Sequence, residues 1–241
     1  MNAAAKIARV LDASGSYSFS FQHSKTMGCA DGGISITSDP EIADRLFRMK
    51  QIGYGPGEHP GNIRKGPAPD LKCYPFRATA FTALILHEQL KLLTDRLERY
   101  GKAAAYLENR LKDSTKIRIQ TRGRRADRQG YYGWVMLFDD PAYADIPVSV
   151  IQKAMVAEGL PVMPTWDPVY RFILFNLKPE AYRIDQPCTV TEQLVPRTLW
   201  MLHAYLGHEM SEVERVADII EKVMSNADEL RDHARRNAGA K

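Results

Sequence analysis

The sequence has little of what would place it in several common functional classes. Its three cysteines, Cys29, Cys73 and Cys188, have neither the spacing of a metal site nor that of a disulfide framework. No stretch approaches the roughly 18 apolar residues that a membrane-spanning helix needs. The N-terminal residues also lack the apolar core of a signal peptide. We therefore expect no membrane span, no bound metal, and a location in the reducing cytoplasm.

The charge balance is also unremarkable, with 33 lysines and arginines against 29 acidic residues and a net charge of +4. The densest basic cluster, residues 122–128, lacks the interleaved aromatic residues that stack on nucleic-acid bases. It lies between two strand-like runs, residues 116–121 and 131–138. We interpret the cluster as a solvated hairpin loop and expect no nucleic-acid partner. The alternative is an unrelated basic binding protein, and this cluster is the feature that would support it.

One lysine follows a strand-like run and precedes paired glycines. Residues 16–21 alternate hydroxyl and aromatic side chains, which is the pattern of a β-strand. Lys25 comes next, in a polar segment that ends at Gly32 and Gly33, where the backbone can turn before a second strand over residues 34–37. A lysine at the end of a strand can point into a cleft and act as an amine nucleophile. The ordinary alternative is a solvated loop lysine.

Four segments together resemble one family. The string FSFQHSK, followed by DGG and ITSD, resembles the cofactor-lysine segment of the DegT/DnrJ/EryC1/StrS family of sugar and cyclitol aminotransferases. Residues 73–81 are similar to the turn that opens a long helix in that family. Residues 166–171 resemble its proline-x-tyrosine-arginine segment, and residues 199–207 its tryptophan-leucine-proline-histidine stretch. The resemblance thus extends over most of the chain.

The resemblance implies an α/β protein with the type I fold of aminotransferases that depend on pyridoxal 5'-phosphate (PLP). Residues 1–105 would be a truncated PLP-binding large domain, and residues 106–241 a small α+β C-terminal domain. In the family, the first half of the large domain precedes the lysine segment and carries the acid that pairs with the PLP pyridine nitrogen. Only a short segment stands before Lys25 here. We therefore expect exposed apolar surface, and either a homodimer or a partner that supplies the missing half. The alternative source of that half is a protein that starts upstream of Met1.

The resemblance also assigns roles to individual residues. Lys25 would hold PLP as a Schiff base and act as the catalytic base, and Ser20 would bind the cofactor phosphate. Tyr170, Arg171 and Arg77 would contact substrate, although domain packing or a structural ion pair is an equal alternative for each. Pro75 departs from the family, because relatives have an asparagine there that reaches the phosphate of the neighbouring subunit. Proline has neither that amide nor a backbone N–H.

The implied function is PLP-dependent transamination of a keto-sugar or keto-cyclitol, with glutamate or glutamine as the amino donor. Such a reaction belongs to amino-sugar or antibiotic biosynthesis. The alternative is a non-catalytic truncated remnant, or an interaction partner of a full-length aminotransferase.

Turn and capping signals predict the remaining elements. Apolar periodicity and proline or glycine at the ends favour helices. We expect them over residues 40–50 with a cap at Asp39 or Ser38, 77–112, 148–158 ending at Gly159, 191–205 and 211–234, with a long loop over residues 51–71.

Overall fold

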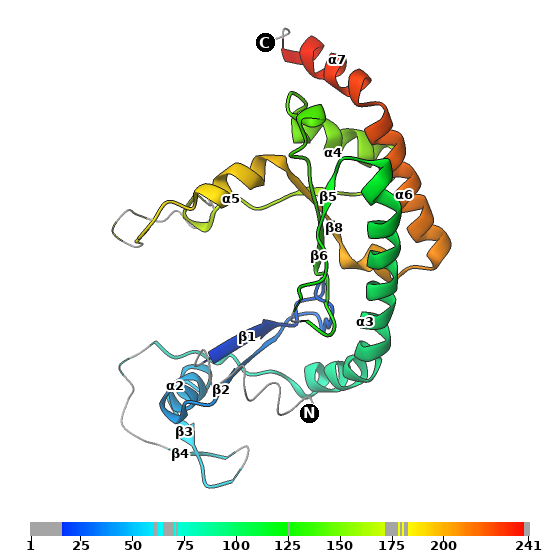
Figure 1. Cartoon of the computed structure of the whole chain (residues 1–241). Helices are drawn as coiled ribbons and strands as arrows, with labels where there is room; N and C mark the ends of the chain where they lie inside the picture. Colours follow the sequence, from blue (N-terminus) through cyan, green and yellow to red (C-terminus); the bar gives the residue numbers. More distant parts are fainter. Residues whose placement is uncertain are drawn as a thin grey trace. The chain divides into compact units, whose positions relative to one another are not determined.

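The computed structural model describes residues 16–59, 62–64, 70, 72–124, 126–171, 178, 180 and 183–238. The chain divides into two compact units, Met1–Leu93 (unit 1) and Thr94–Lys241 (unit 2). This division falls inside the long helix α3 (Ala80–Ser114), which Figure 1 shows in cyan to green. The boundary expected after residue 105 lies inside the same helix and stays a prediction.

Unit 1 begins with a two-stranded antiparallel sheet. Strand β1 (Ser16–Ser20) pairs with β2 (Gly33–Thr37), as the alternation of side chains predicted. Helix α2 (Pro40–Lys50) follows, and the Asp39 carboxylate accepts the N–H groups of Glu41 and Ile42 at 2.8 and 3.1 Å. The predicted helix and its cap are therefore both confirmed.

The predicted loop after α2 contains a short hairpin of β3 (Gly55–Pro56) and β4 (Ile63–Arg64). Residues 60–61, 65–69 and 71 of this loop lie outside the described residues. Helix α3 then begins at Ala80, later than the Arg77 start that we expected. The reason is local, because the Thr79 hydroxyl accepts the N–H of Thr82 at 3.2 Å and so caps the helix there.

Unit 2 is built on a four-stranded antiparallel sheet. In sheet order its strands are β5 (Arg118–Ile119), β6 (Gly133–Leu137), β8 (Thr198–Leu202) and β7 (Met163–Pro164). Strands β5 and β6 form the predicted hairpin around the basic cluster, whose described arginines are exposed. Residue 125 of that cluster lies outside the described residues.

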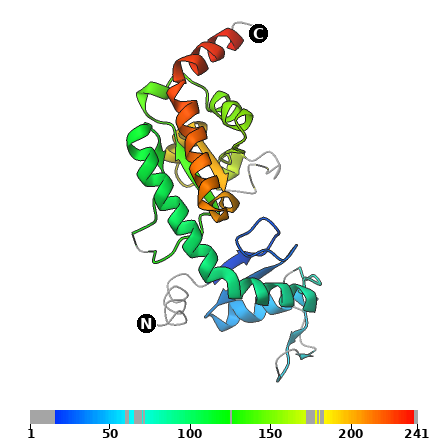
Figure 2. The same cartoon turned by 90° about the vertical axis from the view of Figure 1, so that its right-hand side faces the viewer.

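The hydrophobic core of unit 2 lies on one face of this sheet. Trp134, Met136, Leu199 and Met201 of the two central strands are completely buried. They pack with apolar residues of α3, α4 (Val148–Ala157) and α6 (Met210–Ser225) in one continuous cluster. Figures 1 and 2 both show α6 running alongside the green half of α3.

The predicted helix over residues 191–205 is wrong. Helix α5 (Thr189–Leu194) ends in the 3₁₀ turn η5 (Val195–Arg197), and β8 follows as a central strand. Residues 198–201 are all buried, because strands flank β8 on both sides and the core covers one of its faces. A fully buried strand lacks polar alternation, so its apolar run cannot be distinguished from a helix by periodicity. The 3₁₀ turn η6 (His203–Gly207) then leads to α6.

The last predicted helix is divided into two. Helix α6 ends at Ser225, and α7 (Ala227–Ala238) begins after Asn226. The predicted helix after residue 148 is confirmed, and Gly159 ends it with a φ of +95°, a conformation that glycine adopts without strain. Two 3₁₀ turns, η1 (Pro141–Tyr143) and η2 (Val169–Arg171), complete the unit. Of the helices in the described ranges, none combines the length and the apolar character required to cross a bilayer.

Candidate cofactor site

Lys25 lies in the turn that follows β1, and backbone hydrogen bonds hold this turn. The N–H of Phe21 donates to the carbonyl of Gly32 at 2.8 Å, so pairing between the two chain segments continues past the end of β1. The N–H of Lys25 itself donates to the carbonyl of Gln22 at 2.9 Å and closes a tight turn. The Lys25 side chain is half-buried. The sequence thus places the lysine on a fixed turn at the end of a strand.

Gln22 organises the residues on either side of it. Its Oε1 accepts two hydrogen bonds from Ser24, from the backbone N–H at 3.0 Å and from the hydroxyl at 2.6 Å. Its own N–H donates to the Ser20 hydroxyl at 3.3 Å. Gln22 therefore links the predicted phosphate-binding serine to the residue before Lys25. Sequence reasoning missed this positioning role, although Gln22 belongs to the FSFQHSK string.

The far side of the turn is closely packed. A Cβ at Gly28 would lie 2.7 Å from the carbonyl oxygen of His23, so glycine is required there. Cys29 is only 4% exposed, and its N–H donates to the carbonyl of Phe21 at 2.8 Å. Its thiol also donates to the same carbonyl at 3.5 Å. The loop is therefore folded back onto the end of β1, which limits the positions that Lys25 can reach.

Two functional groups of this turn suit a phosphorylated aldehyde. A primary amine condenses with an aldehyde to form an imine, which is the reaction that the Lys25 side chain offers. The Ser20 side chain is exposed, and its oxygen accepts the N–H of Gln22. A hydroxyl that accepts a hydrogen bond still carries a hydrogen that it can donate to an anion. The donor set of unit 1 thus fits PLP at the lysine and at one phosphate contact.

Arg77 also lies in unit 1, on the extended segment before α3. This segment is anchored to the end of α2, because the N–H of Tyr74 donates to the carbonyl of Met49 at 2.7 Å. The N–H of Arg77 donates to the carbonyl of Pro75 at 3.0 Å, and the Arg77 side chain is exposed. Backbone hydrogen bonds therefore fix the position of this segment, and the Arg77 side chain extends from it into solvent.

Tyr170 and Arg171 lie together in unit 2 and share one acidic partner. The Tyr170 hydroxyl donates to Glu192 Oε1 at 2.6 Å, and Arg171 Nη2 donates to the same oxygen at 2.8 Å. The hydrogen bond to the Glu192 carboxylate raises the pKa of Tyr170 to about 12, because it stabilises the neutral phenol. Sequence reasoning missed Glu192, since nothing in the pattern of α5 distinguishes it from a surface acid.

His203, from the fourth resembling segment, is enclosed by aromatic rings in unit 2. It is 6% exposed and its ring centroid lies 5.5 Å from that of Tyr100 and 5.7 Å from that of Tyr132. Neither ring nitrogen has a hydrogen-bond partner among the described residues. Burial lowers the pKa of His203, and the positive charge of Arg96 lowers it further. The imidazole is therefore held in its neutral form.

The chain is similar to known proteins over most of its length. The model of the DegT/DnrJ/EryC1/StrS aminotransferase family matches residues 8–221. An L-glutamine:2-deoxy-scyllo-inosose aminotransferase of Streptoalloteichus tenebrarius is 27% identical over 229 residues, which cover 88% of this chain and 54% of the relative. The crystal structure of 3-amino-5-hydroxybenzoic acid synthase superposes with a TM-score of 0.71 at 21% identity, over 88% of this chain and 54% of that one.

A third similar protein was solved with a cofactor. The Escherichia coli GDP-4-keto-6-deoxy-D-mannose-3-dehydratase contains bound hydrated PLP, and it superposes with a TM-score of 0.65 at 17% identity. The match covers 85% of this chain and 54% of the dehydratase.

The fold is therefore that of type I PLP-dependent aminotransferases, and the lysine turn lies within the matched region. The chain belongs to the DegT/DnrJ/EryC1/StrS aminotransferase family. It spans about half the length of the curated relatives that it matches, 54% of the S. tenebrarius enzyme.

Proposed function

We propose that this chain supplies the lysine-bearing half of a PLP-dependent aminotransferase that acts on a keto-cyclitol or keto-sugar. The observation that carries the proposal is the turn around Lys25, which Gln22 and the backbone of β1 hold in place. The amino donor is L-glutamine or glutamate, in line with the name of the S. tenebrarius relative. The product belongs to amino-sugar or secondary-metabolite biosynthesis.

Lys25 and Ser20 are the proposed cofactor residues of this chain. PLP supplies an electron sink that stabilises negative charge at the donor's α-carbon. Lys25 Nζ would hold the cofactor, and the same amine would serve as the base for the proton on that carbon. The Ser20 hydroxyl would donate its hydrogen to the cofactor phosphate. Pro75 offers no N–H at the family's second phosphate position, so we expect the Ser20 contact to carry more of the phosphate binding.

Tyr170, Arg171 and Arg77 are the proposed substrate residues. Arg171 is 57% exposed at its side chain although one of its nitrogens binds Glu192. A guanidinium has five N–H donors, so Arg171 retains donors for a hydroxyl or keto oxygen. Arg77 is an exposed cation suited to a carboxylate such as that of the amino donor.

Unit 1 exposes apolar side chains that a partner would cover. Among its described residues, Cys29 is the only hydrophobic side chain that is buried. Phe19 and Ile34, which lie opposite each other on β1 and β2, are 51% and 48% exposed. A stripe on α3 is also exposed, at Phe81, Leu84, Ile85 and Leu92. Exposed apolar surface of this extent marks an interaction site.

We propose that this surface packs against a polypeptide segment equivalent to the part of the relatives that the chain does not match, on the same protein or on a partner. Within the described residues the β1–β2 sheet has two strands, and an isolated pair of strands is marginally stable in water. A partner that adds strands pairs with N–H and C=O groups at the edges of the sheet. The same partner can cover the side chains of Phe19 and Ile34. A homodimer of the assembled units would then complete the protein.

Reconstitution tests the function. The chain is co-expressed with the unmatched part of the S. tenebrarius relative, and the complex is supplied with PLP, scyllo-inosose and L-glutamine labelled with ¹⁵N at the α-amino group. We expect ¹⁵N in an aminocyclitol product, loss of transfer in Lys25→Ala, and retention in Lys72→Ala, an exposed lysine elsewhere in unit 1. A complex that forms, binds PLP and transfers no label would indicate the non-catalytic partner instead.

A further inference from the structure

The segment from Met163 to Arg171 is fixed at both of its ends. At the first end, Met163 and Pro164 pair with β8, and the N–H of Thr165 donates to the carbonyl of Thr198 at 3.4 Å. At the other end, Arg171 is bound to Glu192 of α5. Such anchoring limits the movement of the residues in between, so a side chain there has a defined position before any ligand arrives.

Trp166 lies in this fixed segment and stacks on a buried tryptophan. The ring centroids of Trp166 and Trp200 are 4.8 Å apart, with an angle of 30° between their planes. Trp200 is 5% exposed, and its indole N–H donates to the carbonyl of Pro164 at 3.0 Å. A Cβ at Gly133 would lie 2.8 Å from Trp200, so glycine makes room for this ring. Trp200 is therefore an immobile base for Trp166.

The exposed part of Trp166 resembles a binding platform. The residue is 52% exposed although Trp200 covers part of it, so indole surface remains open to solvent. Two charged residues of the same anchored segment, Asp167 and Arg171, are exposed as well. A segment that presents an aromatic surface and charged side chains to solvent suits a ligand that combines an apolar face with a polar rim.

We infer that Trp166 binds the carbon ring of a cyclitol and that Arg171 donates to one of its oxygens. This inference rests on the proposed function. In a scyllo-configured cyclitol every hydroxyl is equatorial, so both faces of the ring present only C–H groups. These groups carry partial positive charge and are attracted to the negative face of an indole. The equatorial oxygens point outward, where the remaining N–H donors of Arg171 can bind them.

Glu192 positions Arg171 in this arrangement. Its Oε1 binds Arg171 at 2.8 Å and the Tyr170 hydroxyl at 2.6 Å, so the two side chains are held by one carboxylate oxygen. The Arg171 guanidinium is thereby held in one orientation before the cyclitol binds. Replacing Glu192 would weaken cyclitol binding without removing any group that touches the ligand.

Saturation-transfer NMR tests the proposal with scyllo-inositol and the purified chain, in the absence of PLP. We expect transfer to the ring protons, and Trp166→Ala to weaken binding roughly threefold to tenfold, the range of one aromatic contact. Trp166→Phe retains a ring and should bind with an intermediate affinity. The control is Val190→Ala, which removes another exposed apolar group of unit 2 and should leave binding unchanged.

Circular dichroism establishes that each variant is folded. Absence of transfer from the folded parent chain, or equal binding by Trp166→Ala and the parent, would overturn the proposal. Sedimentation of the parent and of Trp166→Ala would show whether Trp166 is a protein contact, since loss of self-association without a change in cyclitol binding would also overturn it. Because PLP is left out, a failure here is distinct from a failure of Lys25 to bind the cofactor.

Discussion

The surroundings of a side chain determine its protonation in this structure, and His203 shows this most clearly. Tyr100 and Tyr132 enclose its ring, and within the described part of the chain neither ring nitrogen has a hydrogen-bond partner. A buried base without a hydrogen-bond partner resists protonation. The neutral imidazole thus contributes to packing in unit 2. Because protonation would disrupt that packing, the stability of unit 2 is sensitive to acid.

We predict that the free energy of unfolding decreases as the pH falls below about 6.5, the ordinary pKa of histidine in an unfolded chain. The pKa of His203 is lower in the folded chain because of burial and Arg96. Between these two pKa values the unfolded chain binds a proton that the folded chain does not, so stability is complete above this window and declines through it. The slope is at most about 1.4 kcal/mol per pH unit.

Urea denaturation between pH 8 and 5.5 measures this dependence. His203→Phe, which keeps an aromatic ring and removes the titrating group, should have a flatter profile than the parent. Identical pH slopes for the two proteins would show that other groups cause the dependence.

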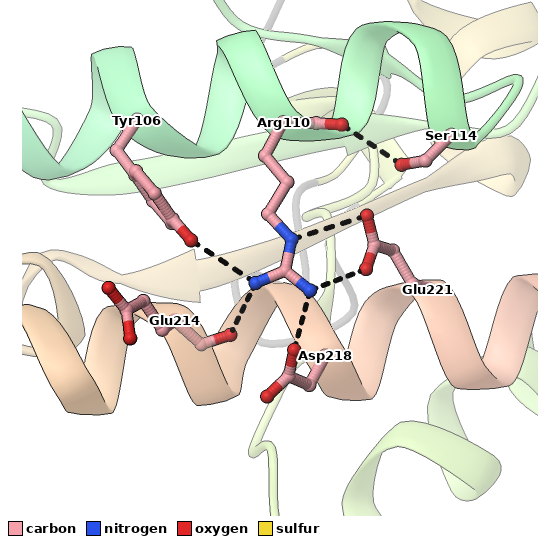
Figure 3. A network of polar contacts seen from close by, with 6 residues as sticks. All are labelled: Tyr106, Arg110, Ser114, Glu214, Asp218 and Glu221. Carbon is pink, nitrogen blue, oxygen red and sulfur yellow. Dashed lines mark hydrogen bonds and ion pairs between the residues drawn. The ribbon is translucent and has the colours of Figure 1, made fainter.

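At the scale of elements, one arginine joins the helices that cover the core of unit 2. Arg110 of α3 binds Asp218 at 2.5 Å and both carboxylate oxygens of Glu221 at 2.6 and 3.3 Å, as Figure 3 shows. It also donates to the carbonyl of Glu214 at 3.4 Å and to the Tyr106 hydroxyl at 3.1 Å. These hydrogen bonds raise the pKa of Arg110 and lower that of Glu221. Helix α6 is thus fixed to α3 by its outer face as well as by the core.

We predict that Arg110→Met destabilises unit 2 by about 1.5–3 kcal/mol, the range for hydrogen bonds to charged groups. Arg118→Met is the matched control, because Arg118 binds Asp139 at 2.5 Å but is 66% exposed at its side chain. An exposed ion pair contributes roughly 0–1 kcal/mol. Urea denaturation compares the two variants, and equal losses of stability would contradict a special role for the α3–α6 contact.

Two glycines of unit 2 provide a second comparison. Gly133→Ala would place a Cβ 2.8 Å from the Trp200 ring, whereas Gly123→Ala meets nothing within 4 Å. We expect the first substitution to lower stability by about 1–3 kcal/mol through overpacking, and the second to change it by less than about 0.5 kcal/mol. Thermal unfolding measures both. A Gly133→Ala protein as stable as the parent would show that Trp200 is mobile.

Some elements could be predicted from the sequence and others could not. Asp39 and Pro40 predicted the start of α2 correctly, because capping depends on residues that are adjacent in the chain. Strand β8 was missed because its burial comes from β6 and β7, which are distant in sequence. Glu192 was missed for the same reason, since its importance arises from Tyr170 and Arg171 across the fold. Lys25 was singled out because its segment resembles a known family motif, and its role stays a prediction.

At the scale of the whole molecule, the two units differ in how their apolar residues are covered. Unit 2 has a continuous core that joins its sheet to α3, α4 and α6. In the described part of unit 1, large apolar side chains such as Phe81, 79% exposed, remain at the surface. A chain that spans about half of its relatives is expected to differ in this way, if unit 1 folds together with the polypeptide proposed above. Small-angle scattering of the complex would then report one compact particle.

The most direct test of Lys25 as the cofactor residue is to map the lysine that binds PLP. The chain, together with the unmatched part of the S. tenebrarius relative, is incubated with PLP and reduced with borohydride, and its peptides are analysed by mass spectrometry. We predict a single phosphopyridoxyl group on Lys25, which is lost in Lys25→Ala and weakened in Ser20→Ala. Labelling scattered over several lysines, or a single label on another lysine, would contradict the assignment of Lys25 as the cofactor residue.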